Sequence, residues 1–198
     1  MAIVILLDQR QSRSREDLVG EWSQALNEEL GPRLLLPFTR TSGDEMQALL
    51  GPGALGTIVR RALASGDWWI GIGAGEVEQP LPADTREGRG PAFWNARQAI
   101  EQAKTRRETR PVSVVAEDEV GQRLTQCLDP LAFVITRRTG SQREAAAAYF
   151  RTGTVQAAAR ELGMSVQGAR KNVLAAGCDE EIALGSLVDW IADPVATP

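Results

Sequence analysis

The sequence predicts an α+β domain followed by a small all-α domain. Over the first two thirds of the chain, apolar runs typical of strands alternate with amphipathic segments typical of helices. After Gly140 the chain changes to short, alanine-rich helical segments. The charge changes as well, because residues 137–178 carry seven basic and two acidic side chains in a chain whose net charge is −4. We therefore expect one domain over residues 1–137 and a second over residues 138–198.

The fold of the first domain is predicted from the order of its segments. Residues 2–7 are apolar throughout, as in a strand covered on both faces. Residues 15–30 carry an apolar stripe that indicates an amphipathic helix, and a Ser-Gly turn predicts a hairpin over residues 33–50. The later segments are expected to be a helix over 54–64, a strand over 67–75, a helix over 91–107, a strand over 111–116, a helix over 117–127 and a last strand over 131–136. The order βαββαβ of the first six elements is that of the ferredoxin-like fold.

Three short helices are expected in the second domain, over residues 142–151, 154–162 and 166–176. Thr154 and Ser165 stand where helices need an N-cap. Ala159 is small enough for two helices to cross closely, and Gly163, four residues later, permits the turn between them. This spacing is typical of a helix-turn-helix unit. A final apolar helix over residues 182–192 is expected to cap the small domain.

The third of these helices carries side chains suited to DNA. Arginine and glutamine hydrogen-bond base edges, and lysine binds phosphate. The candidate DNA-binding residues are Ser165, Gln167, Arg170, Lys171 and Asn172. Double-stranded DNA is the expected partner, and a homodimer is expected because such units usually bind palindromic sites. A helical protein-interaction module stays open as the alternative.

Acidic residues stand at two strand ends that the predicted order brings together. Asp8 ends the first strand, and Asp44 and Glu45 follow the hairpin turn. Carboxylate oxygens suit Mg²⁺, which commonly shares them with substrate phosphates. We therefore predict these three residues as metal ligands, beside a bound nucleotide or another phosphate compound. The residues expected to bind that ligand are Gln9, Arg10, Ser12, Arg13, Ser42 and Gly43. The alternative is that these acids only terminate strands, as Asp often does in turns.

The composition excludes several functional classes. The chain has no histidine, which excludes His-based triads and most zinc sites. Its two cysteines, Cys127 and Cys178, form no CxxC pattern and are expected to be reduced thiols of a cytoplasmic protein. No apolar run approaches the roughly 18 residues of a membrane span, so no membrane contact is expected.

Several short motifs together carry a family resemblance. They are the apolar strand ending in Asp8 with its Ser-Arg loop, Ser-Gly-Asp-Glu at residues 42–45, Ile-Gly-Ile-Gly at residues 70–73, Gly-Pro-Ala at residues 90–92 ahead of Ala-Arg at residues 96–97, and the C-terminal helix-turn-helix. In these features the chain resembles the SatD family of small bacterial proteins, over nearly its whole length. The C-terminal helices are also similar to sigma-factor region-4-type domains.

The first domain resembles, more distantly, the catalytic domains of nucleotidyl cyclases and GGDEF-type diguanylate cyclases. In those domains, an Asp that ends the first strand and an acidic residue at the hairpin hold metal ions on a nucleoside triphosphate. Asp8 and Asp44 stand at the corresponding positions. Cyclases also carry an Asn and an Arg four residues apart on the next helix, whereas Asn95 is followed four residues later by Ala99. The resemblance therefore implies the metal-and-phosphate half of such a site and leaves the catalytic half unmatched.

Together these patterns predict a bacterial, cytoplasmic transcription regulator. Its first domain is expected to sense a nucleotide or another phosphate-containing ligand, with Mg²⁺, and its second to bind DNA. Two alternatives stay open. One is a nucleotidyl cyclase or a related Mg²⁺-dependent phosphoryl-transfer enzyme, and the other is a protein-interaction or scaffold protein with a vestigial acidic site.

Overall fold

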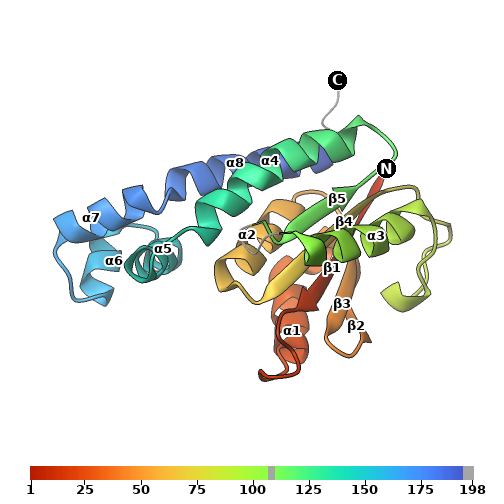
Figure 1. Cartoon of the computed structure of the whole chain (residues 1–198), viewed down its shortest axis with the longest axis horizontal. Helices are drawn as coiled ribbons and strands as arrows, with labels where there is room; N and C mark the ends of the chain where they lie inside the picture. Colours follow the sequence, from red (N-terminus) through yellow and green to blue (C-terminus); the bar gives the residue numbers. More distant parts are fainter. Residues whose placement is uncertain (107–109, 194–198) are drawn as a thin grey trace.

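The computed structural model describes residues 1–106 and 110–193. Its centre is a five-stranded sheet with the strand order β2-β3-β1-β4-β5 (Figure 1). The strands are β1 (Ala2–Gln9), β2 (Leu34–Ser42), β3 (Glu45–Leu50), β4 (Trp68–Gly75) and β5 (Val112–Val115). β1 pairs antiparallel with both β3 and β4, β2 pairs antiparallel with β3, and β5 runs parallel to β4. The predicted α+β class is confirmed.

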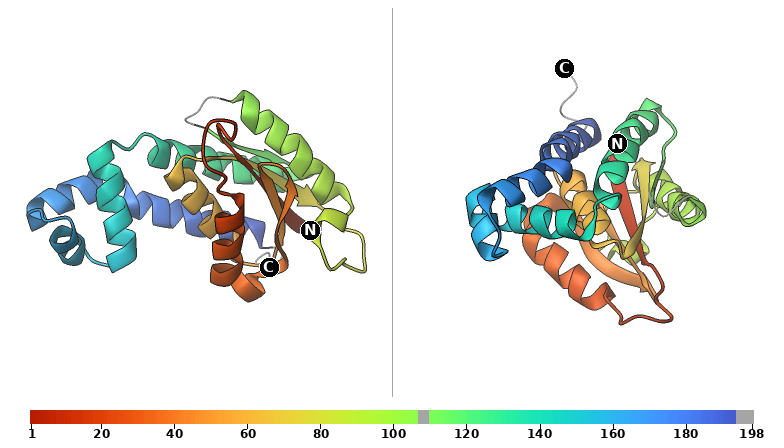
Figure 2. Two further views of the ribbon diagram at one scale, coloured as in Figure 1. Left: turned by 90° about the horizontal axis from the view of Figure 1, so that it is seen from below. Right: turned by 60° about the vertical axis from the view of Figure 1, so that its left-hand side comes forward.

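Helices cover both faces of the sheet. One face packs against α1 (Val19–Leu30), α2 (Leu55–Ser65), α4 (Glu119–Thr136) and α8 (Cys178–Ala192). The other face packs against α3 (Pro91–Thr105), which Figure 2 shows on the opposite side of the sheet. Two short 3-10 helices, η1 (Gly31–Arg33) and η2 (Thr85–Glu87), lie in the connections.

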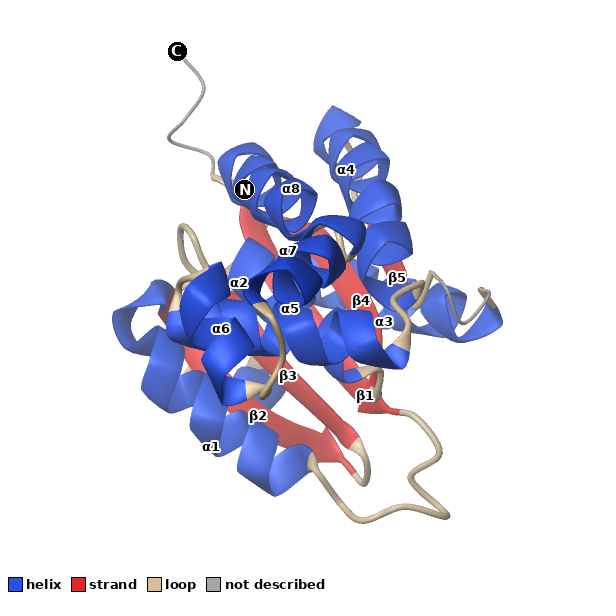
Figure 3. Ribbon diagram, turned by 90° about the vertical axis from the view of Figure 1, so that its left-hand side faces the viewer, coloured by secondary structure: helices blue, strands red, loops and turns tan. Residues whose placement is uncertain are grey.

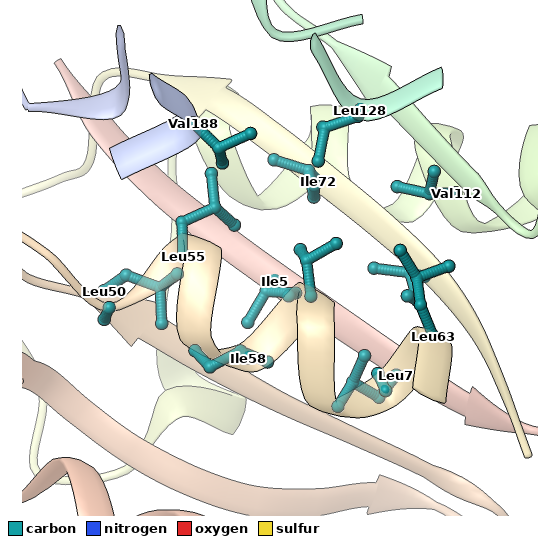
Figure 4. Packing of buried hydrophobic residues seen from close by; sticks show 14 of the residues in the cluster. Ile5, Leu7, Leu50, Leu55, Ile58, Leu63, Ile72, Val112, Leu128 and Val188 are labelled. Carbon is teal, nitrogen blue, oxygen red and sulfur yellow. The ribbon is translucent and has the colours of Figure 1, made fainter. Parts of the chain in front are cut away.

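The side chains of β1 alternate between two cores. Ile5 and Leu7 join the larger core with α1, α2, α4 and α8 (Figure 4), whereas Val4 and Leu6 join the core beneath α3. Successive side chains of a strand point to opposite faces, so Asp8 continues the series that points toward α3. This alternation places the first predicted acid on the α3 side of the sheet.

Glycines in β4 allow α3 to lie close to the sheet. A Cβ on Gly73 would stand 2.1 Å from the carbonyl oxygen of Ala92, and a Cβ on Gly71 would stand 2.5 Å from the backbone nitrogen of Ile100. No side chain fits between the two backbones at these positions. The glycines of the Ile-Gly-Ile-Gly motif at residues 70–73 therefore serve the close contact between β4 and α3.

The strand expected over residues 131–136 is wrong, because these residues form the last turns of α4. Leu128, Leu131 and Ile135 are buried at spacings of three and four residues, so they form one helical stripe against the larger core. Phe133, between them, is 51% exposed. An apolar run this short cannot show whether its buried positions repeat as in a helix or as in a strand. The helical repeat becomes visible only when the run is read together with Leu128.

Three short helices follow α4 and lie at one end of the molecule, on the left in Figure 1. They are α5 (Gly140–Thr152), α6 (Val155–Glu161) and α7 (Val166–Ala175). The side chains of Thr139, Thr154 and Ser165 accept hydrogen bonds from the first-turn N–H groups of α5, α6 and α7. These caps satisfy backbone donors that the helix itself leaves unpaired, which explains why each helix begins where it does.

The last helix, α8, does not cap the small helices as expected, because it returns along α2 and α4 (Figure 1). Val188 lies in the larger core with Leu55 of α2. Glycines permit the close crossing, since a Cβ on Gly56 would stand 2.3 Å from the carbonyl oxygen of Gly185. The Asp189 carboxylate accepts a hydrogen bond of 2.7 Å from the Gly56 N–H. α8 therefore packs mainly on the sheet domain.

The two cysteines are buried and unpaired with each other. Burial raises the pKa of the Cys178 thiol to about 11, so the thiolate that reacts or binds metal is disfavoured. Across residues 1–106 and 110–193, none of the helices combines the length and the apolarity needed to cross a membrane.

Candidate functional site

Two of the predicted acids lie side by side on the α3 face of the sheet. In the antiparallel pairing of β1 with β3, Asp8 stands directly opposite Glu45. Residues that face each other in this way project to the same side of the sheet. Their side chains are only 12% and 5% exposed. The sequence-based expectation that the end of the first strand meets the hairpin is thereby met for this pair.

Helix α3 supplies a cation to each of these carboxylates. The ammonium of Lys104 lies 2.8 Å from Oδ2 of Asp8, and the guanidinium of Arg97 donates a 2.6 Å hydrogen bond to Oε2 of Glu45. Arg97 and Lys104 are seven residues apart, which places both on the stripe of α3 that faces the sheet. The hydroxyl of Thr41 donates to the other oxygen of Glu45. Both acids are therefore neutralised by partners from this chain.

The electrostatics of the Asp8 pair follow from its burial. Burial raises the pKa of Asp8, and the hydrogen bond and positive charge of Lys104 offset only part of this effect. Burial alone would lower the pKa of Lys104, but its contacts with Asp8 and Glu101 together raise it. A carboxyl pKa raised by folding favours the folded protein at acidic pH and loses that contribution as the pH rises through the raised value. The raised pKa of Lys104 acts in the opposite sense at neutral pH, because a base that is held more strongly protonated in the folded protein stabilises it there.

The third predicted acid, Asp44, belongs to a different place. It lies at the tip of the β2–β3 hairpin, where its carboxylate accepts a hydrogen bond from the hydroxyl of Ser12. Its backbone carbonyl accepts a 2.9 Å bond from the Gln9 N–H. These contacts join the hairpin to the loop after β1. Beside them is a cavity of about 480 Å³, called here the hairpin cavity, which is lined by Gln9, Ser12, Arg13, Asp17, Arg40, Gly43 and Asp44.

Five residues predicted for the metal and phosphate site thus line one cavity, but the others do not. The guanidinium of Arg10 stacks 4.6 Å from the ring centroid of Trp69, and it also bonds to the Gly66 carbonyl. Ser42 is exposed at the end of β2 and does not line the hairpin cavity. The side chain of Gln9 holds the loop itself, since it bonds to the backbone of residues 16 and 18. The predicted site is therefore divided between two places, the α3 face of the sheet and the hairpin cavity.

A Mg²⁺ ion would need oxygens that are free to bind it. Within residues 1–106 and 110–193, no three side chains of Asp, Glu, His or Cys gather closely enough to hold a metal. At Asp8 and Glu45 an ion would have to displace Lys104 and Arg97. The carboxylate pair as arranged does not fit a metal centre, so the magnesium site stays a prediction.

The predicted DNA-binding residues share one helix. Ser165 caps the start of α7, and Gln167, Arg170 and Lys171 are exposed along it. Asn172 is half-buried, and its carbonyl accepts the N–H of Ala176. In the described part of the chain, neither Arg170 nor Lys171 has an acidic partner. Figure 3 shows α6 and α7 facing the viewer, in front of the sheet.

A second concave site was missed by the sequence-based reasoning. A groove of about 640 Å³ lies between α3, the hairpin and the loop that precedes α3. It is called here the α3 groove, and it is lined by Thr41, Gln47, Glu78, Arg86, Gly88, Arg89, Phe93, Trp94 and Arg97. Residues 86–97 interleave three arginines with two adjacent aromatic residues, and this pattern was the available signal.

Comparison with known proteins gives one match. Residues 2–156 match the SatD family. The matched range includes all five strands of the sheet and the helices α1 to α5, and it ends within α6. α7 and α8 lie beyond the matched range, so the match is shorter than the resemblance expected from the motifs. No curated protein and no solved structure matches the chain. Because the match spans well over half of the sequence, the chain belongs to the SatD family.

Proposed function

We propose that this chain is a DNA-binding transcription regulator whose sheet domain binds a nucleotide or another phosphate-containing ligand. The observation that carries the DNA-binding part is the exposed face of α7. It presents Gln167, Arg170 and Lys171 together, and within the described residues no carboxylate neutralises the two cations. Charged side chains without internal partners are free to bind phosphate and base edges.

The connection between α6 and α7 supports a helix-turn-helix unit. Gly163 adopts a φ of 63°, which a side chain would disfavour, and so reverses the chain between the two helices. Ala158 and Ala159 are buried at the contact, where small side chains allow a close crossing. In such units the second helix enters the major groove, and that role falls to α7 here. Two copies of the chain would suit a palindromic site.

The sheet supports the ligand-binding part. The antiparallel order β2-β3-β1-β4 is the arrangement expected of a ferredoxin-like βαββαβ domain, with β5 added at the edge. The hairpin cavity offers the guanidinium of Arg13 beside the turn at Gly43, whereas the Ser12 hydroxyl already donates to Asp44. Guanidinium donors are suited to phosphate oxygens.

The geometry favours binding over catalysis by this domain. Asp8 and Glu45 are held by cations from α3, whereas two-metal phosphoryl transfer needs carboxylates that hold metal ions. The side-chain amide of Asn95 donates a 2.8 Å bond to the Ala74 carbonyl, so it serves the contact between α3 and β4. A regulator that senses its ligand is therefore the function that these contacts favour over a cyclase.

We expect the double variant Arg170→Ala, Lys171→Ala to bind duplex DNA at least tenfold more weakly than the unaltered chain, because about two phosphate or base contacts are lost. Fluorescence anisotropy with a labelled duplex, repeated at several salt concentrations, measures this. The slope of log affinity against log salt should fall by up to about 2. The matched control is Arg110→Ala, Arg123→Ala, which removes two exposed cations from the sheet domain. The proposal would be contradicted if the affinity for DNA changed neither with the salt concentration nor in the α7 double variant.

The ligand-binding part predicts that a nucleoside phosphate raises the melting temperature of the protein. At a concentration of 100 times its Kd, a ligand of the folded state adds about 2.7 kcal/mol to the free energy of unfolding. Thermal melts against a panel of nucleotides, with and without Mg²⁺, measure the shift. Asp179→Asn, on the exposed start of α8, is the control for nonspecific effects of lost charge. A panel that leaves the melting temperature unchanged rules out nucleotides as the sensed ligand.

A further inference from the structure

The α3 groove is built from elements that are fixed in place. Its outer wall is the loop around η2, which is anchored to β3 by two reciprocal hydrogen bonds. The side chain of Gln47 donates to the Thr85 carbonyl at 2.7 Å, and the Thr85 hydroxyl donates to the Gln47 carbonyl at 3.2 Å. Thr85 is fully buried. The loop is also seated on α3, because a Cβ on Gly88 would stand 2.1 Å from the Phe93 ring. The groove is therefore preformed.

Three guanidinium groups converge on this groove with hydrogen-bonding capacity to spare. Arg86 uses Nε and Nη2 on Asp84, and Arg97 uses Nη1 on Glu45. Each therefore keeps N–H donors that these partners do not use. Among the described residues, Arg89 forms no side-chain hydrogen bond and no ion pair. Such donors bind phosphate or carboxylate oxygens strongly, because the bond is assisted by charge.

An aromatic side chain stands beside these cations. Trp94, in the first turn of α3, is 76% exposed, the highest exposure among the large hydrophobic residues of the described chain. Phe93 beside it is buried against the η2 loop and gives the groove its apolar floor. An exposed indole costs free energy in water and offers a flat surface on which a planar ring can stack.

One carboxylate, that of Glu78, also lines the groove. It has no ion-pair partner within the described residues. A carboxylate among guanidinium groups disfavours a bare polyanion, because it repels negative charge. It suits a ligand that carries hydrogen-bond donors as well as an anionic group. Nucleoside phosphates have both, since the base and the ribose donate hydrogen bonds and the phosphate accepts them.

We propose that the α3 groove binds a nucleoside phosphate. The base stacks on Trp94, the phosphate accepts hydrogen bonds from Arg89 with Arg86 and Arg97, and Glu78 accepts a hydrogen bond from the base or the ribose. This inference deepens the sensing part of the proposed function and does not depend on DNA binding. The α3 groove and the hairpin cavity share no lining residue, so substitutions can separate them.

Isothermal titration calorimetry of the full chain with AMP and GMP tests this assignment. Arg89→Ala and Trp94→Ala should each weaken binding about tenfold, because each removes one charge-assisted or stacking contact. Trp94→Phe keeps an aromatic ring and should stay within about threefold of the unaltered chain. The matched controls are Trp190→Ala, a tryptophan that is 61% exposed on α8, and Arg123→Ala, whose side chain is 60% exposed on α4. Thermal melts without ligand confirm that each variant is folded.

The two cavities give different outcomes in the same titrations. The proposal expects Ser12→Ala, Asp44→Asn to leave the affinity unchanged, while the two groove substitutions weaken it. If the hairpin variant abolishes binding and the groove variants do not, the groove assignment is overturned and ligand sensing at the hairpin cavity survives. Absence of any heat from AMP or GMP at millimolar concentration overturns the groove assignment for these ligands, and DNA binding remains to be measured separately by anisotropy.

Discussion

Gly73→Ala is expected to lower the free energy of unfolding by about 3 kcal/mol or more, at the upper end of the cost of overpacking a core. The new methyl group would stand 2.1 Å from the Ala92 carbonyl oxygen and 2.2 Å from the Ala96 backbone nitrogen. Both contacts are with backbone, which cannot turn aside as a side chain can. The clash can be relieved only if α3 moves away from β4, and this movement would open the hydrophobic core between α3 and the sheet. Urea denaturation followed by far-UV circular dichroism measures the loss.

Gly20 provides a control of opposite sign for the same substitution. It lies in α1, is exposed, and has no atom within 4 Å of the position where a Cβ would stand. Alanine is favoured over glycine within helices by roughly 0.5–1 kcal/mol, so Gly20→Ala should stabilise the protein slightly. If Gly73→Ala proved as stable as the unaltered chain, the close contact between β4 and α3 would be wrong.

The movement of α3 also has a functional consequence. α3 carries Trp94 and Arg97 of the groove and the cations that pair with Asp8 and Glu45. A variant that displaces this helix should therefore weaken nucleotide binding as well as stability. For that reason Gly73→Ala is a test of the fold and not of the groove.

Glu181→Gln is expected to lower the free energy of unfolding by about 3 kcal/mol, because it leaves a buried guanidinium without its counter-charge. Glu181 of α8 bonds to Arg138 at 2.5 Å and to Arg60 of α2 at 2.9 Å. The side chains of Arg138 and Glu181 are only 3% and 4% exposed. Arg138 also donates to the Ala176 carbonyl at 2.8 Å. This network joins α2, the end of α4 and the start of α8.

Glu180→Gln is the matched control, since Glu180 is the exposed neighbour on the same turn of α8. This control substitution removes only a favourable interaction of the carboxylate with the N-terminus of α8, worth less than about 1 kcal/mol. Equal urea midpoints for the two variants would show that the buried network contributes nothing. A loss confined to Glu181→Gln would show that the buried network stabilises the fold where α2, the end of α4 and the start of α8 meet.

Local patterns in the sequence predicted most individual elements. The uninterrupted apolar run of β1, the hairpin turn at Gly43 and the caps at Thr154 and Ser165 all lie where expected. These features depend on neighbours in the chain, so a short window contains the information. The start of α1 is one exception. The helix begins at Val19, four residues later than expected, and the Asp17 carboxylate accepts the hydrogen bond of the Val19 N–H.

The candidate site was predicted only in part, because its partners come from distant segments. The pairing of Asp8 with Glu45 followed from the order of the strands. The two cations that occupy these acids, Arg97 and Lys104, lie more than fifty residues further along the chain than Glu45 or Asp8. Nothing local marks them as partners, since their position depends on how closely α3 approaches β4.

The sequence alone determined the α+β class, the strands up to β5, the three short helices near the C-terminus with the caps of two of them, and the exposed basic face of α7. Periodicity, turn residues and caps are properties of short segments, so they can be recognised without knowledge of the tertiary contacts. Only the tertiary structure decided that α8 packs on α2 and that the acids of the sheet are neutralised by α3. In each case the decision comes from burial: an apolar stripe must find a complementary face, and a buried carboxylate must find a cation, wherever in the chain these lie.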